Sequence, residues 1–170
     1  MHIFFVKQSP EVPLPSYATN GSAGMDISAI IAEPVSIAPG AWVCIPTGLK
    51  VMIPLGFEGQ IRPRSGLALR HGLTVLNAPG TIDSDYRGEI QVLLINMGTV
   101  PVTVHNGDRI AQLIIAPVCH VVPFEQNSLS STERGSGGFG STGLLSNIFN
   151  TLWGFFNTLK RMLNALGRIL

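Results

Sequence analysis

Short apolar runs, several of them alternating with polar residues, follow one another over the first 115 residues of the chain. They are rich in Val and Ile, and Gly, Pro, Asn and Asp separate them. This pattern predicts short strands of an all-β sandwich, barrel or jelly roll. All twelve prolines lie between residues 10 and 123, which argues against long helices there, and only Ser65–Arg70 is expected to form a helical turn. Strands are expected at residues 3–7, 35–37, 41–46, 49–53, 57–62, 73–76, 89–96, 101–105 and 110–115.

The hydrophobic period changes after Gly143. From Leu145 to Ile169 apolar residues recur every three or four positions, and polar residues occupy the opposite side. This spacing predicts an amphipathic helix of about 25 residues within 144–170. No apolar run reaches the roughly 18 residues typical of a membrane-spanning helix.

Composition and charge narrow the possible partners. The net charge is only +1, so a general affinity for nucleic acid is not expected. Charged residues make up 12% of the chain and the mean hydropathy is +0.34, which suggests that a partner or a membrane covers some apolar surface. Residues 1–143 carry 8 Lys or Arg and 10 Asp or Glu, whereas residues 144–170 carry three cationic residues and no acid.

The cysteines and histidines show no metal-site or disulfide pattern. Cys44 and Cys119 each lie in an apolar run and are expected to be buried free thiols. Such thiols suit a reducing compartment, the cytoplasm or the nucleus.

The N-terminal M-H-I-F-F-V-K-Q lacks the pattern of a signal peptide and is expected to form the first strand.

Five stretches combine charge, glycine and polarity. They are A-G-M-D-I-S-A (23–29), P-R-S-G-L-A (63–68), N-A-P-G-T-I-D-S-D-Y-R-G-E-I (77–90), G-D-R-I-A-Q-L-I (107–114) and R-G-S-G-G-F-G-S-T-G (134–143). Each alone could be an ordinary turn, and the last could be a flexible linker.

Together these stretches suggest an anion site. The side chains of Arg64, Ser65, Gln112, Arg134 and Ser136 are donors suited to phosphate oxygens, and several Gly N–H groups accompany them.

Other residues of the same stretches add the remaining parts of a nucleotide hydrolase. Asp26 could help to hold a hydrated Mg²⁺, and Asp83 could activate a water molecule. Tyr86 and Phe139 offer flat faces for a sugar and a base. Composition alone does not show that these groups converge.

In this order and spacing, the five stretches resemble the five motifs of the trimeric deoxyuridine triphosphatases, from about Val12 to Gly143. The resemblance implies a jelly-roll-like β barrel of residues 1–133 that assembles as a homotrimer. It also implies active sites at subunit interfaces and a mobile arm, residues 134–143, that usually comes from a third subunit. The implied reaction converts dUTP and water into dUMP and pyrophosphate with the help of Mg²⁺.

The resemblance also implies roles for single residues near the nucleoside. Asp83 would deprotonate the attacking water, and Tyr86 would pack under the deoxyribose and exclude a 2′-hydroxyl. The backbone around Asn77 and a hairpin from Gly80 to Tyr86, which includes Ile82, would bind the uracil edge.

The phosphates would meet a second group of residues. Ser65, Gly66 and Gln112 would hold the α- and β-phosphates, Arg64 would neutralise charge, and Asp26 would contact Mg²⁺ through water. In the arm, Arg134 would meet the γ-phosphate, Phe139 would stack on uracil, and Gly135, Ser136, Gly137 and Gly138 would fold over the phosphates. Asp85 and Arg109 are expected in an interface or hairpin salt bridge, and Asp108 is expected to cap a turn.

Two alternatives share the same fold. One is deoxycytidine triphosphate deaminase, which calls for a glutamate-centred site. The other is a scaffold used mainly to present the C-terminal helix. In most relatives the arm ends the chain, whereas here 27 residues follow it. Residues 144–170 could lie in a membrane interface, form a coiled coil or be a fused assembly peptide.

Overall fold

A computed structural model describes residues 1–141 and 152–160. The chain divides into two units, Met1–Val122 and Pro123–Leu170, and each is described by itself. The predicted boundaries of 1–133, 134–143 and 144–170 stay predictions.

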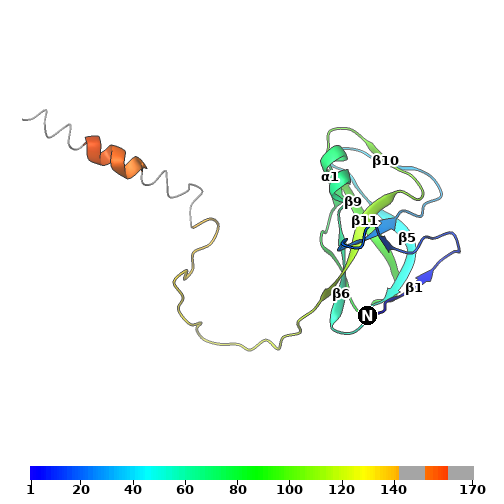
Figure 1. Cartoon of the computed structure of the whole chain (residues 1–170), viewed down its shortest axis with the longest axis horizontal. Coiled ribbons are helices and arrows are strands. Elements are labelled where there is room, and N and C mark those ends of the chain that lie inside the picture. The colour runs from blue at the N-terminus through cyan, green and yellow to red at the C-terminus, as the bar shows by residue number, and fades with distance from the viewer. Residues whose placement is uncertain (142–151, 161–170) are drawn as a thin grey trace, which may run out of the picture. The chain divides into compact units, whose positions relative to one another are not determined.

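The first unit is built almost entirely of strands, as the hydrophobic pattern predicts (Figure 1). A four-stranded sheet has the order β1-β5-β9-β7, a five-stranded sheet the order β2-β3-β11-β6-β8, and β10 pairs with β4. The elements are β1 (Phe4–Lys7), β2 (Ser16–Tyr17), β3 (Met25–Ser28), β4 (Val35–Ile37), β5 (Trp42–Met52), β6 (Phe57–Arg62), α1 (Ser65–His71), β7 (Leu73–Val75), β8 (Gly80–Ile82), β9 (Glu89–Asn96), β10 (Val102–Val104) and β11 (Arg109–Pro117).

One hydrophobic core joins the two larger sheets. Ile45 and Leu94 from one sheet and Ile27, Ile61 and Leu113 from the other are all buried in the same cluster. Strand residues between them face outward, because successive side chains of a strand point to opposite sides. The core therefore fixes which polar residues of each strand reach the surface.

The predicted strands are confirmed with three kinds of difference. Residues 41–46 and 49–53 belong to one strand, β5, whose pairing with β9 shifts register between Pro46 and Lys50. The short strands β2, β3 and β8 were not predicted. The expected hairpin from Gly80 to Tyr86 is wrong, because β8 pairs with β6 in one sheet while β9 pairs with β5 and β7 in the other. Asp83 to Tyr86 thus form a turn between two sheets.

The second unit contains the Gly-rich stretch and a helical segment. Residues 152–160 are helical, and the rest of the helix predicted within 144–170 lies outside the described residues. Within the described ranges, no helix is long and apolar enough to cross a membrane.

Candidate active site

Four arginines line a cavity of about 500 Å³ on the first unit. This arginine cavity also contains Asp26, which is the only acidic residue in its lining. Three of the five sequence stretches therefore meet here, and the excess of positive charge suits a polyanionic ligand. The polar lining residues are Ser22, Asp26, Arg62, Arg64, Ser65, Arg70, Arg109 and Gln112.

The strand register brings these residues together. Gln112 on β11 lies opposite Asp26 on β3 and opposite Arg62 on β6. Met25 and Ile27 point into the core, so Asp26 between them faces the cavity side of the sheet. Gly24 allows a close approach here, because an added Cβ would lie 2.6 Å from Oε1 of Gln112.

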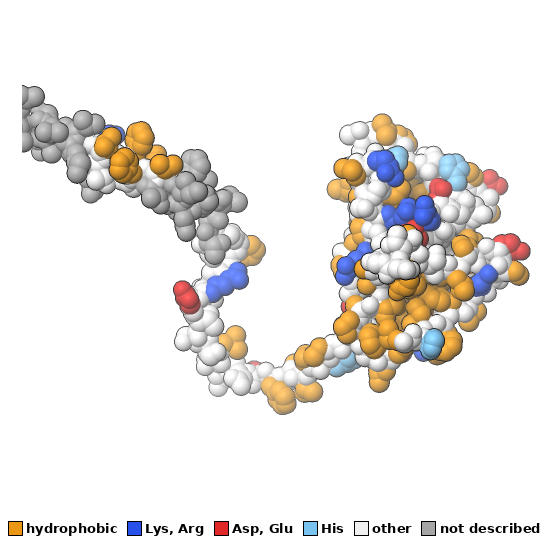
Figure 2. Space-filling view, viewed as in Figure 1, with side chains coloured by type: hydrophobic (Ala, Val, Ile, Leu, Met, Phe, Trp, Pro, Cys, Tyr) orange, Lys and Arg blue, Asp and Glu red, His pale blue; other side chains and the backbone are white. Residues whose placement is uncertain are grey.

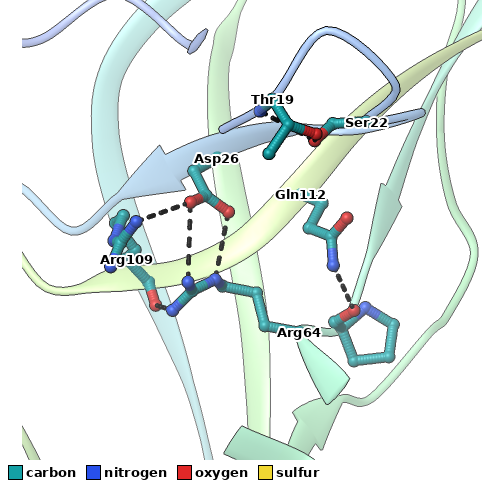
Figure 3. A network of polar contacts seen from close by, with 7 residues as sticks. Thr19, Ser22, Asp26, Arg64, Arg109 and Gln112 are labelled. Atoms are coloured by element: carbon teal, nitrogen blue, oxygen red, sulfur yellow. Dashed lines mark hydrogen bonds and ion pairs between the residues drawn. The ribbon is translucent and has the colours of Figure 1, made fainter. Parts of the chain in front are cut away.

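Asp26 holds two arginines at the cavity wall (Figure 3). Arg64 donates from Nε to Oδ1 of Asp26 at 3.0 Å and from Nη1 to the carbonyl oxygen of Arg109 at 3.1 Å. Arg109 donates from Nη1 to Oδ2 of Asp26 at 3.0 Å. The Asp26 side chain is only 16% exposed, so these charge-assisted bonds are partly shielded from water.

This network corrects one expectation and qualifies another. Arg109 pairs with Asp26, 83 positions away along the chain, and so not in a hairpin salt bridge, whereas an interface salt bridge stays a prediction. Both carboxylate oxygens of Asp26 already accept from arginine, which leaves only their remaining lone pairs for a hydrated metal ion. Arg64 retains further N–H donors that can meet an anion.

Helix α1 carries the second stretch into the cavity. Its N-cap residue Arg64 has an extended backbone, and Ser65 and Gly66 follow as the first helical residues. No acidic residue lies in the first turn. The helical turn expected at Ser65–Arg70 is confirmed.

The turn after β8 borders a second cavity, of about 430 Å³. This Asp83 cavity shares no lining residue with the arginine cavity. Its lining residues are Cys44, Asn77, Thr81, Ile82, Asp83, Tyr86, Glu89, Ile90, Gln91 and Leu93.

Local contacts shape this second cavity. The backbone N–H of Tyr86 donates to the carbonyl oxygen of Asp83 at 3.1 Å, which closes the turn. Oη of Tyr86 donates to the carbonyl oxygen of Glu89 at 3.0 Å, and the ring lies against Gly88, where a Cβ would be 2.2 Å from Oη. The side chain of Ile82 is buried in the core, so only its backbone is available to a ligand.

The expected burial of both cysteines is wrong, because Cys44 and Cys119 are exposed. Cys44 points away from the core, and its thiol donates to Oε1 of Gln91 at 3.2 Å. Partial burial, and then the Glu89 carboxylate, raise the pKa of the Cys44 thiol.

Sequence reasoning missed several residues of both cavities. Arg62 and Arg70 lie just outside the P-R-S-G-L-A stretch, and Cys44 and Gln91 lie on strands that carry no motif. Alternation along β5, β6 and β9 could have indicated the outward direction of Cys44, Arg62 and Gln91, whereas Arg70 lies in α1. The role predicted for Asp108 is confirmed, because its Oδ2 accepts from the backbone N–H of His105 at 2.8 Å and caps the turn.

The Gly-rich stretch is described to residue 141 and forms consecutive turns. Arg134 donates from Nε to the carbonyl oxygen of Gly137 at 2.8 Å. The backbone N–H of Ser141 donates to the carbonyl oxygen of Gly138 at 3.0 Å. Phe139 has a φ of 46° and a fully exposed ring. This stretch belongs to the second unit, so the roles expected for Arg134, Gly135, Ser136, Gly137, Gly138 and Phe139 stay predictions.

Comparison with known proteins identifies the family of the chain. The dUTPase family model matches residues 10–143, a range that spans all five stretches and ends where the predicted arm ends. The chain belongs to the dUTPase family. It is therefore a hydrolase of dUTP, and the deaminase alternative is set aside.

Individual relatives agree with this assignment. The deoxyuridine 5'-triphosphate nucleotidohydrolase of Desulfotalea psychrophila is 55% identical over 138 residues, which cover 81% of this chain and 92% of the relative. That of Sinorhizobium medicae is 57% identical over 133 residues, with 77% and 83% covered. A dUTPase mutant of Staphylococcus bacteriophage 80alpha with dUpNHpp has a similar structure, with a TM-score of 0.76, 25% identity, and 84% and 99% of the chains covered.

Proposed function

We propose that dUTP is hydrolysed to dUMP and pyrophosphate where the arginine cavity of one subunit faces the Asp83 cavity of a neighbour in a homotrimer. The observation that carries this proposal is the separation of the two cavities within one chain. One cavity has the phosphate-binding donors and the other has the candidate base, and they share no residue. Neither cavity alone offers the groups for the reaction, so a second subunit would complete the site.

The arginine cavity would bind the triphosphate. Arg64 is fixed by Asp26 and still has free N–H donors, so it can bind a phosphate oxygen without first being ordered. Ser65, Gly66 and Gln112 line the same cavity and would hold the α- and β-phosphates. Fixed donors of this kind stabilise the charge that develops on the leaving pyrophosphate.

Asp83 would act as the general base. Its side chain is exposed at the cavity, and it takes part in none of the ion pairs found among residues 1–141 and 152–160. The carboxylate would take a proton from a water molecule whose oxygen bonds to the α-phosphorus. The bond from that phosphorus to the bridging oxygen would break in line, and pyrophosphate would leave.

Tyr86 and the backbone near Asn77 would select the nucleoside. The Tyr86 ring is held by its bond to the Glu89 carbonyl and by its packing on Gly88. A ring fixed in this way would leave no space for a 2′-hydroxyl and so would exclude UTP. The side chain of Asn77 lies beside Gly80, where an added Cβ would be 3.1 Å from its Nδ2. A site with fixed polar groups can reject wrong substrates strongly.

Residues 134–143 would close over the nucleotide, from a third subunit. Arg134 would pair with the γ-phosphate, and Phe139 would stack on uracil. Both side chains are exposed, which supports their availability for a ligand. The glycines around them permit the backbone to fold closely over phosphates.

The chain's own residues fit Mg²⁺ only as an outer-sphere ion. Among the described residues, no group of three or more His, Cys, Asp or Glu side chains could hold a metal ion. Asp26 is the only carboxylate of the arginine cavity and would contact the ion through water. Mg²⁺ keeps several waters and is commonly bound by substrate phosphates, whose charge it would neutralise here.

The substitution Asp83→Asn tests the proposed base. It preserves size and removes the proton acceptor, so turnover of dUTP should fall by at least about 100-fold. Binding of dUpNHpp, measured by calorimetry, should change little. Asp85→Asn in the same turn is the matched control, because Asp85 does not line the cavity, and it should keep most of the activity. An Asp83→Asn protein that hydrolyses dUTP at the normal rate would show that another group activates the water.

A further inference from the structure

The helical segment 152–160 displays an apolar surface that the hydrolase function does not explain. The family match ends at residue 143, so this segment lies outside the range that the dUTPase family model covers. Figure 2 shows hydrophobic side chains at the surface of this segment. Its large apolar side chains are between 45% and 73% exposed: Leu152, Trp153, Phe155, Phe156 and Leu159. Exposed aromatic residues in such number typically mark a binding surface.

The apolar residues form one face of the helix. With about 100° of rotation per residue, Leu152, Phe155, Phe156 and Leu159 fall within an arc of roughly 100°. Asn157 and Thr158 lie on the opposite side. The Thr158 hydroxyl is satisfied there by donating to the carbonyl oxygen of Gly154 at 2.9 Å.

Trp153 and Lys160 lie at the same border of this face, two turns apart along the helix, because residues seven apart are separated by only about 20° around the helix axis. Trp prefers the boundary between water and lipid, where its ring is buried and its N–H is solvated. Lys buries its apolar stem and keeps its ammonium group in water. An aromatic and a cationic residue at the border of an apolar face are typical of a helix that lies in a membrane interface.

The charges of this segment favour a membrane interface over a bundle of helices. Residues 144–170 contain Lys160, Arg161 and Arg168 and no Asp or Glu. Parallel coiled coils use oppositely charged pairs beside the apolar seam to stabilise the partners, and this segment has no acid to form them. Association of several copies would bring like charges together, whereas an anionic lipid surface would attract each copy by about 1 kcal/mol per cationic residue.

We propose that the helical segment 152–160 attaches the enzyme to anionic membrane surfaces, with its aromatic face inserted at the interface and its axis in the membrane plane. Polar residues recur every few positions in 144–170, so the sequence has no apolar run of the length that a spanning helix needs, and its pattern is typical of a helix in the interface. Attachment does not require the hydrolase reaction. It rests on the proposed function only in that three helices per trimer would bind more strongly than one.

Vesicle binding by the full chain tests this inference. The protein is mixed with vesicles of phosphatidylcholine alone or of phosphatidylcholine with phosphatidylglycerol, and the bound fraction is measured by co-sedimentation. We expect strong binding only to the vesicles that contain phosphatidylglycerol, and none by a chain that ends at Gly143. Trp153 emission, followed in a Trp42→Phe background, should shift to the blue as the ring enters the interface.

A matched pair of variants distinguishes insertion of the apolar face from attraction between the cationic residues and anionic lipid. Phe155→Glu and Asn157→Glu each add one negative charge, the first on the apolar face and the second on the polar face. Phe155→Glu should lower the partition coefficient at least about tenfold more than Asn157→Glu, because only the first buries a carboxylate. Equal losses would show that no apolar face inserts and would overturn the proposal.

Two further results would also overturn the proposal. A full chain that stays in the supernatant with anionic vesicles overturns the proposal, and dUTP hydrolysis measured in the same sample shows whether the enzymatic function stands without it. Light scattering without lipid provides a further check. Particles larger than a trimer that Phe155→Glu returns to trimers would show that the apolar face pairs with copies of itself, which would also overturn the proposal.

Discussion

At the scale of single residues, Asp26 shows how one carboxylate can position two arginines at the wall of a cavity. It accepts from Arg64 and Arg109 at 3.0 Å each, and it is largely shielded from solvent. The bonds fix both guanidinium groups while the cavity as a whole keeps an excess of arginine. A triphosphate would therefore meet donors that are already oriented, which lowers the entropic cost of binding.

Cys44 offers a probe of the Asp83 cavity. Its pKa is raised by partial burial and by Glu89, so at neutral pH the thiol is protonated. Alkylation requires the thiolate, so Cys44 should react more slowly than glutathione at neutral pH and approach its rate only as the pH rises. With dUpNHpp at about ten times its Kd, the rate should fall about tenfold further, since only the free site reacts.

The measurement uses iodoacetamide and mass spectrometry of the Cys119→Ser protein. The Cys44→Ser protein is the control, because Cys119 lies outside both cavities and its alkylation should not respond to the nucleotide analogue. An unchanged Cys44 rate in saturating dUpNHpp would place the nucleotide away from the Asp83 cavity.

At the scale of elements, most strands follow from alternation, and the misses have local causes. Pro46 and Gly48 suggest a strand break, but β5 passes through them by a register shift, with Gly48 at a φ of 66°. Strand β3 alternates between buried and half-buried residues, but it has only four residues, too few for alternation alone to predict it. The sequence around Asp83 is typical of the tip of a hairpin. The strands on either side of this turn pair instead with distant strands, and such pairing leaves no local signal in the sequence.

Gly72 ends α1 and so holds the second stretch in place. It has a φ of 65°, and an added Cβ would lie 2.5 Å from the backbone nitrogen of Gly98. Gly72→Ala should therefore lower the free energy of unfolding by about 1–3 kcal/mol from backbone strain alone, with the clash adding to it. Urea unfolding followed by circular dichroism measures the change.

Gly21→Ala is the matched control, because no atom lies within 4 Å of the added Cβ and its φ is not in the left-handed region. It should leave the unfolding midpoint close to that of the unchanged protein. If Gly72→Ala were as stable as Gly21→Ala, the turn between α1 and β7 would have to adopt another conformation.

At the scale of the whole molecule, the sequence predicts the parts of the site but not their convergence. Alternation explains why Asp26 faces outward, and the register of β3, β11 and β6 explains how three stretches meet. Nothing in composition or spacing indicates that Asp83 and Tyr86 line a different cavity from Arg64 and Gln112. Only the resemblance to a trimeric family leads to the expectation that neighbouring subunits unite them.

Shortening the chain should show that residues 134–143 and residues 144–170 have different functions. A chain ending at Gly143 retains Arg134 and Phe139 and should hydrolyse dUTP at close to the full rate. A chain ending at Glu133 loses both, and its kcat should fall by at least about 100-fold, the usual cost of removing a donor that stabilises transition-state charge. Both chains should remain trimers by light scattering, since the unit Met1–Val122 contains the core. Full activity without residues 134–143 would reduce that stretch to a linker, whereas loss of activity on removal of 144–170 alone would tie the helix to catalysis.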